Sequence, residues 1–353
     1  MLILIILMNT EFRKYIKAVG TGPKLSRDLT LEEAERAFQL IMEGLASDAQ
    51  IGGLLVPLRM KGETAQELAA FLKVTRRFCH LEKMPLEHFV DCGVAYDGKI
   101  KFPHLSVVGA FVAAGSDAAV LLHGQSNTPP KYGISVRDVF MELGVPVDHT
   151  VTETKHDLEE AGVGFLSVEE ICPRFAELKK IREELGLRTV FNHIEKLWNP
   201  LNAPHQIVSI YHGPYLETVP EILIHCGVQH AWVVQGMEGT PDLRVSRPAK
   251  MVEVSGSEKK PFYVIPRELG FDFSAEPLYE KLTARQCADF VEESLRSENG
   301  ILHALAVLNG ALLIYSTRRA ASLSEAVERA RESLNSRRAL NKLESLRKMA
   351  RQF

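Results

Sequence analysis

The chain is organised around residues 90–133, which read VDCGVAYDGKIKFPHLSVVGAFVAAGSDAAVLLHGQSNTPPKYG. The segment 105–115 is apolar and spaced like a helix, and 118–122 is a short buried strand. The loop before the helix contains Gly93, Asp97 and Gly98, and the loop after the strand begins at His123 and Gly124. Such a unit points backbone N–H groups and a helix N-terminus at one place, which suits a phosphate or another anion. On periodicity alone, an ordinary α/β packing unit is the favoured interpretation.

Length and composition indicate a globular protein with one large and one small domain. The chain has 353 residues, 46% of them hydrophobic and 25% charged, which is typical of soluble domains with a sizeable core. A formal net charge of −3 shows no overall basicity, so only local patches would attract nucleic acid. The five cysteines are scattered without a CxxC pair, which favours a reducing compartment over a disulfide framework or a zinc site.

The N-terminus MLILIILMN is apolar but too short to span a bilayer, and no Lys or Arg precedes it as in a signal peptide. We interpret it as an over-extended start, with Met8 as an alternative initiator. We therefore expect a cytoplasmic protein that does not contact a membrane.

Residues 11–77 are predicted to be mostly helical. Three capping boxes begin helices here, at Thr30, Ser47 and Thr64, each followed three residues later by Glu or Gln. The segment 51–60 is apolar nearly all round, next to an apolar face that carries Ala34, Ala37, Phe38 and Ile41. This favours burial against a second subunit, and a single packed core helix is the alternative.

Beyond residue 133, helices alternate with short strands, which predicts an α/β fold with a mostly parallel sheet covered on both faces. We expect helices at 136–143, 158–162, 168–185, 219–226, 284–295 and 301–315, and one helix or a pair of helices at 323–353. We expect strands at 190–194, 206–211, 230–234 and 262–265. The segment 255–260 is expected to form a hairpin or a surface loop.

From Asp28 onward the chain resembles the anthranilate phosphoribosyltransferase family. The resemblance is carried by 28–68, GAFVAAG…HG, IREELGLRTVFN, Asn199-Pro200, YVIPRELGF, and VLNGALLIY followed by SLSEAVERARESL. It implies a small all-helical domain at 9–80, to which helices near 165–190 return, beside a large α/β domain at 81–353 with a central, mostly parallel sheet. It also implies a homodimer formed through the helical domains.

The active-site motifs of that family are altered here. The family's GTGGD loop wraps the pyrophosphate of phosphoribosyl pyrophosphate, whereas this chain has Gly93-Val94-Ala95-Tyr96-Asp97. Glycine lets a backbone approach a phosphate closely, so Tyr96 is expected to occupy space that a pyrophosphate would need. The NIST motif becomes His104-Leu105-Ser106-Val107, and KHGN becomes Leu122-His123-Gly124-Gln125 without its lysine. The remnants of the donor site are Gly93, Asp97, Gly98, Ser106, His123, Gly124 and Lys131.

The family's magnesium site is also changed. Its Asp-Glu pair corresponds to Pro241-Asp242, so one carboxylate is missing. Glu238 is a candidate replacement, although solvated loop acids are the favoured interpretation. We therefore expect no cofactor, and Mg²⁺ only if transferase activity survives.

Arg182 falls where the family's arginine contacts anthranilate. Its guanidinium would bind a carboxylate or a phosphate in bidentate fashion, and a surface charge on the helix 175–185 is an equal alternative.

Three further stretches separate branches of the family. The segments 17–29, HGQSNTPPKYG and QGMEGTPDL are similar to a divergent paralogue group whose donor motifs are altered in the same places. Characterised members of that group form dimers that bind nucleic acid and do not make phosphoribosyl anthranilate.

The resemblance therefore implies no catalytic residues and a cleft that contacts nucleic-acid phosphates regardless of sequence. The candidate contacts are Lys99, Lys101, Lys131, Lys179, Lys180, Arg182 and Lys196. The alternative is an active phosphoribosyl- or glycosyltransferase that uses anthranilate or another acceptor.

Overall fold

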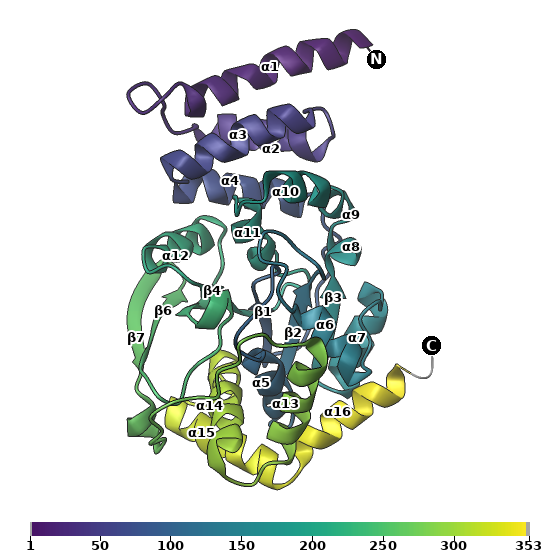
Figure 1. The fold of residues 1–353 in the computed structure, drawn as a ribbon, viewed down its shortest axis with the longest axis vertical. Coiled ribbons are helices and arrows are strands. Elements are labelled where there is room, and N and C mark those ends of the chain that lie inside the picture. The colour runs from purple at the N-terminus through teal and green to yellow at the C-terminus, as the bar shows by residue number, and fades with distance from the viewer. Residues whose placement is uncertain (1, 351–353) are drawn as a thin grey trace.

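In the computed structural model, which describes residues 2–350 and side chains from residue 10 onward, a helical layer lies on an α/β layer (Figure 1). The helical layer begins with four helices: α1 (Leu2–Gly20), α2 (Leu31–Met42), α3 (Asp48–Lys61) and α4 (Ala65–Arg76). All three expected capping boxes are present, because Thr30, Ser47 and Thr64 each accept the N–H of the Glu or Gln three residues on. The starts of α2, α3 and α4 are therefore confirmed.

Short helices from the middle of the chain complete the helical layer. They are α8 (Val168–Ile171), α9 (Pro173–Ala176), α10 (Lys179–Leu185), α11 (Phe191–Ile194) and the 3₁₀ turn η1 (Glu195–Leu197). Phe191 on α11 packs edge-on against Phe38 of α2 and Phe175 of α9. This aromatic cluster joins the returning helices to the N-terminal ones.

The α/β layer is built on a seven-stranded sheet with the order β3-β2-β1-β4-β5-β6-β7. The first five strands in this order are parallel to one another, and β6 and β7 form an antiparallel hairpin at one edge. The strands are β1 (Phe89–Gly93), β2 (Ala119–Gly124), β3 (Val163–Ser167), β4 (His205–Ile210), β5 (His230–Gln235), β6 (Ala249–Ser255) and β7 (Glu258–Val264). The α/β class and the mostly parallel sheet agree with the sequence-based expectation.

The sheet separates two apolar cores because successive side chains of a strand point to opposite faces. Val90 and Cys92 lie in the core under α5, α13 and α14, whereas Phe89 belongs to the core shared with the helical layer. The remaining helices are α5 (Leu105–Ala114), α6 (Val136–Leu143), α7 (Val151–Glu160), α12 (Tyr215–His225), α13 (Ala284–Arg296), α14 (Gly300–Ser316), α15 (Leu323–Asn335) and α16 (Arg338–Met349), with short turns η2 (Met237–Gly239) and η3 (Pro266–Leu269). One core therefore continues from the sheet into α1–α4.

Three expected elements are wrong. The helix expected at 158–162 is the end of α7 followed by strand β3, and the long helix expected at 168–185 is broken into α8, α9 and α10. Pro173 begins α9 because a proline is tolerated in the first turn of a helix and not in its interior. The strand expected at 190–194 is the helical turn α11, where the side chain of Asn192 accepts the N–H of Thr189 at 3.1 Å.

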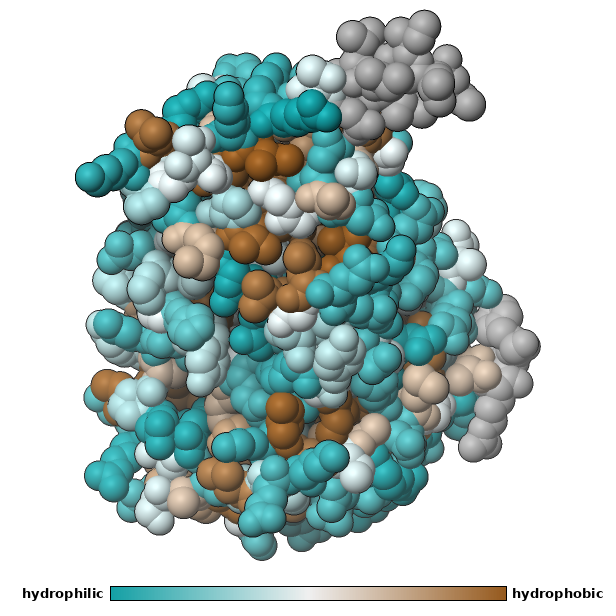
Figure 2. Space-filling model, turned by 45° about the horizontal axis from the view of Figure 1, so that its top comes forward, coloured by the Kyte–Doolittle hydropathy of each residue, from teal (hydrophilic) through white to brown (hydrophobic). Residues whose placement is uncertain are grey.

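The surface expected to dimerise is only partly available. Ala34, Phe38 and Ile41 are completely buried inside the protomer, so they cannot form an interface. On α3, however, Val56 is half-buried and Met60 is 80% exposed. On the face seen in Figure 2, apolar side chains gather amid a mostly hydrophilic surface. The outer face of α3 is thus the part of this expectation that the fold leaves possible.

Within residues 2–350, no single helix is both long and apolar enough to cross a bilayer. The helices α13 and α14 reach the necessary length and hydropathy only as a pair, and they meet at 89°.

Candidate functional site

The loop between β1 and α5 packs against the protein's own backbone. Lys99 and Ile134 exchange two backbone hydrogen bonds of 2.8 Å each. Gly98 has a φ of 73°, and a Cβ at this position would lie 2.4 Å from the carbonyl oxygen of Ile134. A Cβ on Gly93 would similarly lie 2.2 Å from the carbonyl oxygen of Lys196. Both glycines are therefore needed for close contact between chain segments.

Tyr96 belongs to this loop, and its side chain is buried with 1% of its surface exposed. Its hydroxyl donates to the carbonyl oxygen of Glu195 at 3.1 Å and lies 2.5 Å from Nδ1 of His123. The direction of the contact with His123 depends on the tautomer of the imidazole, since Nδ1 accepts from the hydroxyl when the ring proton is on Nε2. Nε2 of His123 then faces the buried Asp91 carboxylate at 3.3 Å. These three side chains form a buried polar chain under the remnant of the donor loop.

The N-terminus of α5 does hold an anion, and that anion is the carboxylate of Asp242. Its Oδ1 accepts the N–H of Ser106 at 2.8 Å, and its Oδ2 accepts the N–H of Leu105 at 3.1 Å. The buried ammonium of Lys99 lies 2.5 Å from the same Oδ2. Burial raises the pKa of Asp242, but the charge of Lys99, the neighbouring His104 and the side-chain hydrogen bonds from Lys99 and Thr240 together outweigh burial, and the net pKa is lowered. The backbone donors that would suit a phosphate are therefore occupied by a carboxylate of the chain itself.

The carboxylate of Glu238 accepts hydrogen bonds from a second group of backbone N–H groups. Its two carboxylate oxygens accept the N–H groups of Ile100, Lys101 and Phe102 at 2.9–3.1 Å. Burial raises the pKa of Glu238, but the hydrogen bonds from Ile100 and Lys101 and the charges of Lys131 and Lys99 together outweigh burial, and the net pKa is lowered. Lys131 approaches the same carboxylate at 3.7 Å. The loop between β1 and α5 is thus closed by a carboxylate from the loop after β5.

The residues present do not fit a magnesium ion. Mg²⁺ needs hard oxygen ligands in near-octahedral geometry, but the Asp242 carboxylate is fully buried and both its oxygens already accept hydrogen bonds. Glu238 is committed to three backbone N–H groups. No three acidic, histidine or cysteine side chains of residues 2–350 gather around a possible metal position. In this conformation the oxygens of Glu238 and Asp242 are thus engaged by the chain's own donors rather than arranged around a metal position.

Three of the expected nucleic-acid contacts are wrong because their charged groups are buried. Lys99 is fully buried against Asp242. Arg182 is 3% exposed, and its Nη1 lies 2.6 Å from the Glu195 carboxylate. Lys196 donates from Nζ to the carbonyl oxygen of Ser209 at 2.7 Å, and burial lowers its pKa to about 8. Because Arg182 is buried, it is not a surface charge. Because it is paired with Glu195, it is also not open to the carboxylate or phosphate of a ligand in this conformation.

The other expected cations reach the surface to different extents. Lys101 and Lys180 are exposed, Lys179 is half-buried and Lys131 is mostly buried. Lys180 lies 3.5 Å from Asp48 and 3.6 Å from Glu184, so its charge is partly balanced. Lys179 donates to the carbonyl oxygen of Ser126 at 3.2 Å.

Arg188 was not among the expected site residues. Its side chain is 42% exposed and lies 2.5 Å from the carboxylate of Asp97 in the donor loop. It follows the left-handed Gly186 that ends α10, and this helix stop was the available signal for a surface position. Arg188 thus connects the helical layer to the donor loop.

A small cavity of about 70 Å³ remains between the layers. The side chains around it include Tyr96, Asp97, Arg188, His193 and Lys196. Small-molecule sites usually measure roughly 300–1,000 Å³, so this cavity is too small for a nucleotide-sized ligand. In this conformation the expected donor site is closed.

Comparisons with known proteins place the chain in a family. Residues 13–79 match the helical bundle domain of a glycosyl transferase family, and residues 88–340 match its a/b domain. Anthranilate phosphoribosyltransferase of Clostridium beijerinckii is 31% identical over 324 residues, 91% of this chain and 95% of that protein. The enzyme of Methanocorpusculum labreanum is 33% identical over 322 residues, 90% of this chain and 93% of that protein.

Solved structures agree with this placement. Anthranilate phosphoribosyltransferase from Thermus thermophilus is 27% identical and superposes with a TM-score of 0.79, over 96% of this chain and 99% of that one. The Saccharomyces cerevisiae enzyme in complex with PRPP and Mg has a TM-score of 0.80 over 98% and 99% of the chains, and at 18% identity it supports the fold alone. The chain belongs to the anthranilate phosphoribosyltransferase family.

Proposed function

We propose that this protein does not transfer a phosphoribosyl group to anthranilate and that it binds nucleic acid as a homodimer. The observation that carries the first part is the internal filling of both anion sites. Asp242 takes the N–H groups at the start of α5, and Glu238 takes those of residues 100–102. A diphosphate would have to displace the buried carboxylate of Asp242 and the partly buried carboxylate of Glu238 from these donors.

Charge also disfavours the parent reaction. Phosphoribosyl transfer depends on positioning the donor and on neutralising the leaving diphosphate. The carboxylates of Asp242 and Glu238 put negative charge where that leaving group would need positive charge. Lys99 is already neutralised by Asp242 at 2.5 Å. The residues around the loop thus offer little to stabilise the leaving group.

The cations that reach the surface, at least in part, support binding of a phosphate backbone. Lys101 lies in the donor loop, Lys179 and Lys180 on α10, and Arg188 just beyond α10. Exposed Lys and Arg release counterions from nucleic acid and attract it regardless of base sequence. Tyr211, which is 58% exposed and also lines the small cavity, adds one aromatic face for base stacking.

Active phosphoribosyl transfer is the second candidate. The relatives that match at 31–33% identity over about nine-tenths of the chain are named as anthranilate phosphoribosyltransferases. This candidate requires the loops that carry Glu238 and Asp242 to open and expose the backbone donors.

A paired assay tests the two candidates on the full-length protein. Calorimetric titration with PRPP and Mg²⁺, and fluorescence detection of phosphoribosyl anthranilate, are both expected to give no signal above background. Saturable PRPP binding with product formation would overturn the proposal and establish the active transferase.

Nucleic-acid binding is tested by fluorescence anisotropy with a labelled single-stranded oligonucleotide over a series of salt concentrations. We expect the logarithm of the association constant to fall with the logarithm of salt, with a slope of roughly −0.7 per phosphate neutralised. The double variant Lys179→Glu/Lys180→Glu should bind every sequence more weakly. Lys259→Glu/Lys260→Glu, on the β6–β7 hairpin, makes the same charge change elsewhere and should leave binding intact. Equal effects of the two double variants, or no binding by the wild type at low salt, would contradict the proposal.

The homodimer and the cytoplasmic location are parts of the same proposal. The outer face of α3, with Val56 and the exposed Met60, supports an interface through the helical domain. All five cysteines are free thiols, as expected for a reducing compartment.

A further inference from the structure

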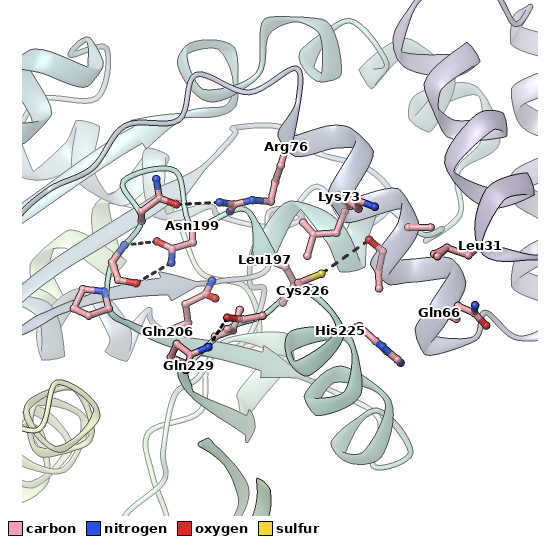
Figure 3. A pocket seen from close by; sticks show the side chains of 18 residues that line it. Leu31, Gln66, Lys73, Arg76, Leu197, Asn199, Gln206, His225, Cys226 and Gln229 are labelled. Atoms are coloured by element: carbon pink, nitrogen blue, oxygen red, sulfur yellow. Dashed lines mark hydrogen bonds between the residues drawn. The ribbon is translucent and has the colours of Figure 1, made fainter. Parts of the chain in front are cut away.

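A second and much larger cavity, of about 750 Å³, lies between the helical layer and the opposite end of the sheet (Figure 3). One wall is the face of α4 that carries Gln66, Ala69, Lys73 and Arg76, spaced three or four residues apart as on one side of a helix. The other wall comes from residues 197–206 and from the end of α12 with the turn after it. Its volume falls within the range of small-molecule sites.

The cavity is lined by basic side chains and by no acidic ones. It contains Lys73, Arg76 and His225, and none of the residues that line it is Asp or Glu. Lys73 already pairs with Glu35 at 2.6 Å. Arg76 is half-buried, and within residues 2–350 it has no carboxylate partner. Its one hydrogen bond goes from Nη2 to the amide oxygen of Asn202 at 3.0 Å, which leaves most of its donors free.

Gln206 supplies an acceptor on the opposite wall. It is 1% exposed, and its Nε2 donates to the buried carboxylate of Asp91 at 3.5 Å. A carboxylate only accepts, so the amide nitrogen must face Asp91 and leave Oε1 as a free acceptor. In the described part of the chain, no group donates a hydrogen bond to this oxygen. Figure 3 shows Arg76 and Lys73 on one side of the cavity and Gln206, Cys226 and His225 on the other.

The lining also has an apolar part and one cysteine. Ala69, Leu197 and Val228 provide the aliphatic surface. Burial raises the pKa of the Cys226 thiol to about 11, so it stays protonated at neutral pH and is not a nucleophile there. The cavity is built for binding rather than for thiolate chemistry.

We propose that this cavity binds a small carboxylate with an apolar body. The carboxylate pairs with the free edge of the Arg76 guanidinium, because the planar fork of arginine matches a carboxylate in bidentate fashion. The apolar body lies against Ala69, Leu197 and Val228, and an N–H or O–H of the ligand donates to Oε1 of Gln206. Because the walls come from both layers, the ligand bridges α4 to the sheet and stabilises their contact.

The test uses the full-length protein and four probes: benzoate, 2-aminobenzoate, benzamide and inorganic phosphate, each titrated by ligand-observed NMR. Benzoate and 2-aminobenzoate should bind saturably, and neutral benzamide and inorganic phosphate should bind at least about tenfold more weakly, since a hydrogen bond to a charged group contributes enough for such a factor. Arg76→Met should weaken benzoate about tenfold or more. Arg77→Met removes the adjacent charge, which pairs with Glu35 outside the cavity, and should leave benzoate binding unchanged.

Ala69→Trp provides a second variant, which fills the cavity without touching Arg76 and should abolish benzoate binding. Equal losses in Arg76→Met and Arg77→Met, equal binding of benzoate and benzamide, or tighter binding of inorganic phosphate would each overturn the proposal. So would benzoate affinity that falls as protein concentration rises, because a second copy of the chain would then occupy the cavity. Oligonucleotide binding should be the same in Ala69→Trp and the wild type, so failure of this site and failure of the proposed function are distinguishable.

Discussion

At the residue scale, the buried pair of Lys99 and Asp242 is the contact that closes the donor region. Both side chains are fully buried, and Nζ lies 2.5 Å from Oδ2. Asp242→Asn keeps the side-chain volume but leaves the Lys99 ammonium without its counter-ion. We expect a loss of roughly 3–5 kcal/mol in the free energy of unfolding, since removing one partner of a buried pair leaves the other charge buried without a counter-ion. Urea denaturation monitored by circular dichroism measures this loss.

The matched control for that substitution is Asp272→Asn. Asp272 pairs with Arg267 at 3.1 Å, and both side chains are about four-fifths exposed, so solvent screens the interaction. We expect little change in unfolding free energy. Comparable losses in the two variants would show that burial of Asp242 does not matter.

A second residue-scale prediction concerns pH. His205 and His230 begin neighbouring strands, with their Nδ1 atoms 2.9 Å apart, and burial lowers the pKa of each to about 4. The positive charges of Arg318 and His88 also disfavour protonation of His205, whereas Glu253 lies 3.3 Å from His230. An unfolded histidine has a pKa of about 6.5, so between about pH 6.5 and pH 4 the unfolded chain binds more protons. Stability should therefore fall as the pH falls through this window.

Thermal unfolding midpoints between pH 8 and pH 4.5 check this expectation, roughly spanning that window. The double variant His205→Gln/His230→Gln should show a shallower pH dependence. The unfolding midpoint of this variant should still depend on pH to some extent, because the pKa values of the buried His104 and His193 are also lowered. An unchanged profile would show that this pair does not couple folding to protons.

At the element scale, the crossing of α5 and α14 depends on glycine at the contact. A Cβ on Gly109 would lie 2.8 Å from the backbone oxygen of Asn309, and one on Gly310 would lie 2.3 Å from Val112. Gly109→Ala should cost about 1–3 kcal/mol of unfolding free energy, because overpacking forces these two helix backbones apart.

Gly52→Ala in α3 is the control for the same chemical change. Its Cβ would meet only the end of the Leu185 side chain at 3.4 Å. Alanine is favoured over glycine inside a helix, so we expect a gain of about 0.5–1 kcal/mol. Denaturant titration of both variants gives the comparison. Losses of the same size at both sites would mean that close contact at the crossing does not determine the effect.

At the scale of the whole molecule, the proposed homodimer should dissociate when negative charge is added to the outer face of α3, and not when it is added elsewhere. Met60 is 80% exposed at the end of α3, and Val56 lies one turn before it on the same side. A glutamate at either position would bury an unpaired charge in an interface, so Val56→Glu/Met60→Glu should shift a micromolar sample from dimer to monomer in sedimentation velocity.

Met141→Glu, on α6 of the α/β layer, serves as the control. Met141 is 54% exposed, and this substitution should leave the sedimentation coefficient of the dimer unchanged. A wild-type monomer at micromolar concentration, or dissociation by both variants, would contradict an interface at α3.

The sequence alone was enough for the features that depend on neighbours a few residues apart. The capping boxes at Thr30, Ser47 and Thr64 need only an acceptor and a Glu or Gln three residues on. The helices Val136–Leu143 and Gly300–Ser316 followed from apolar spacing, and the alternation of helices and strands gave the α/β class. The altered donor motifs could also be read directly from the amino-acid sequence.

Which charged residues are available to a ligand depends instead on the tertiary fold. Lys99, Arg182 and Lys196 look like surface cations in the sequence, but each is buried against a partner that folding brings to it. Asp242 meets the start of α5 across more than 130 residues of chain, and Glu238 meets residues 100–102 in the same way. The free Arg76 and the cavity beside it likewise arise where α4 meets the sheet. Burial and pairing of this kind depend on contacts between distant segments, and no local pattern of residues encodes them.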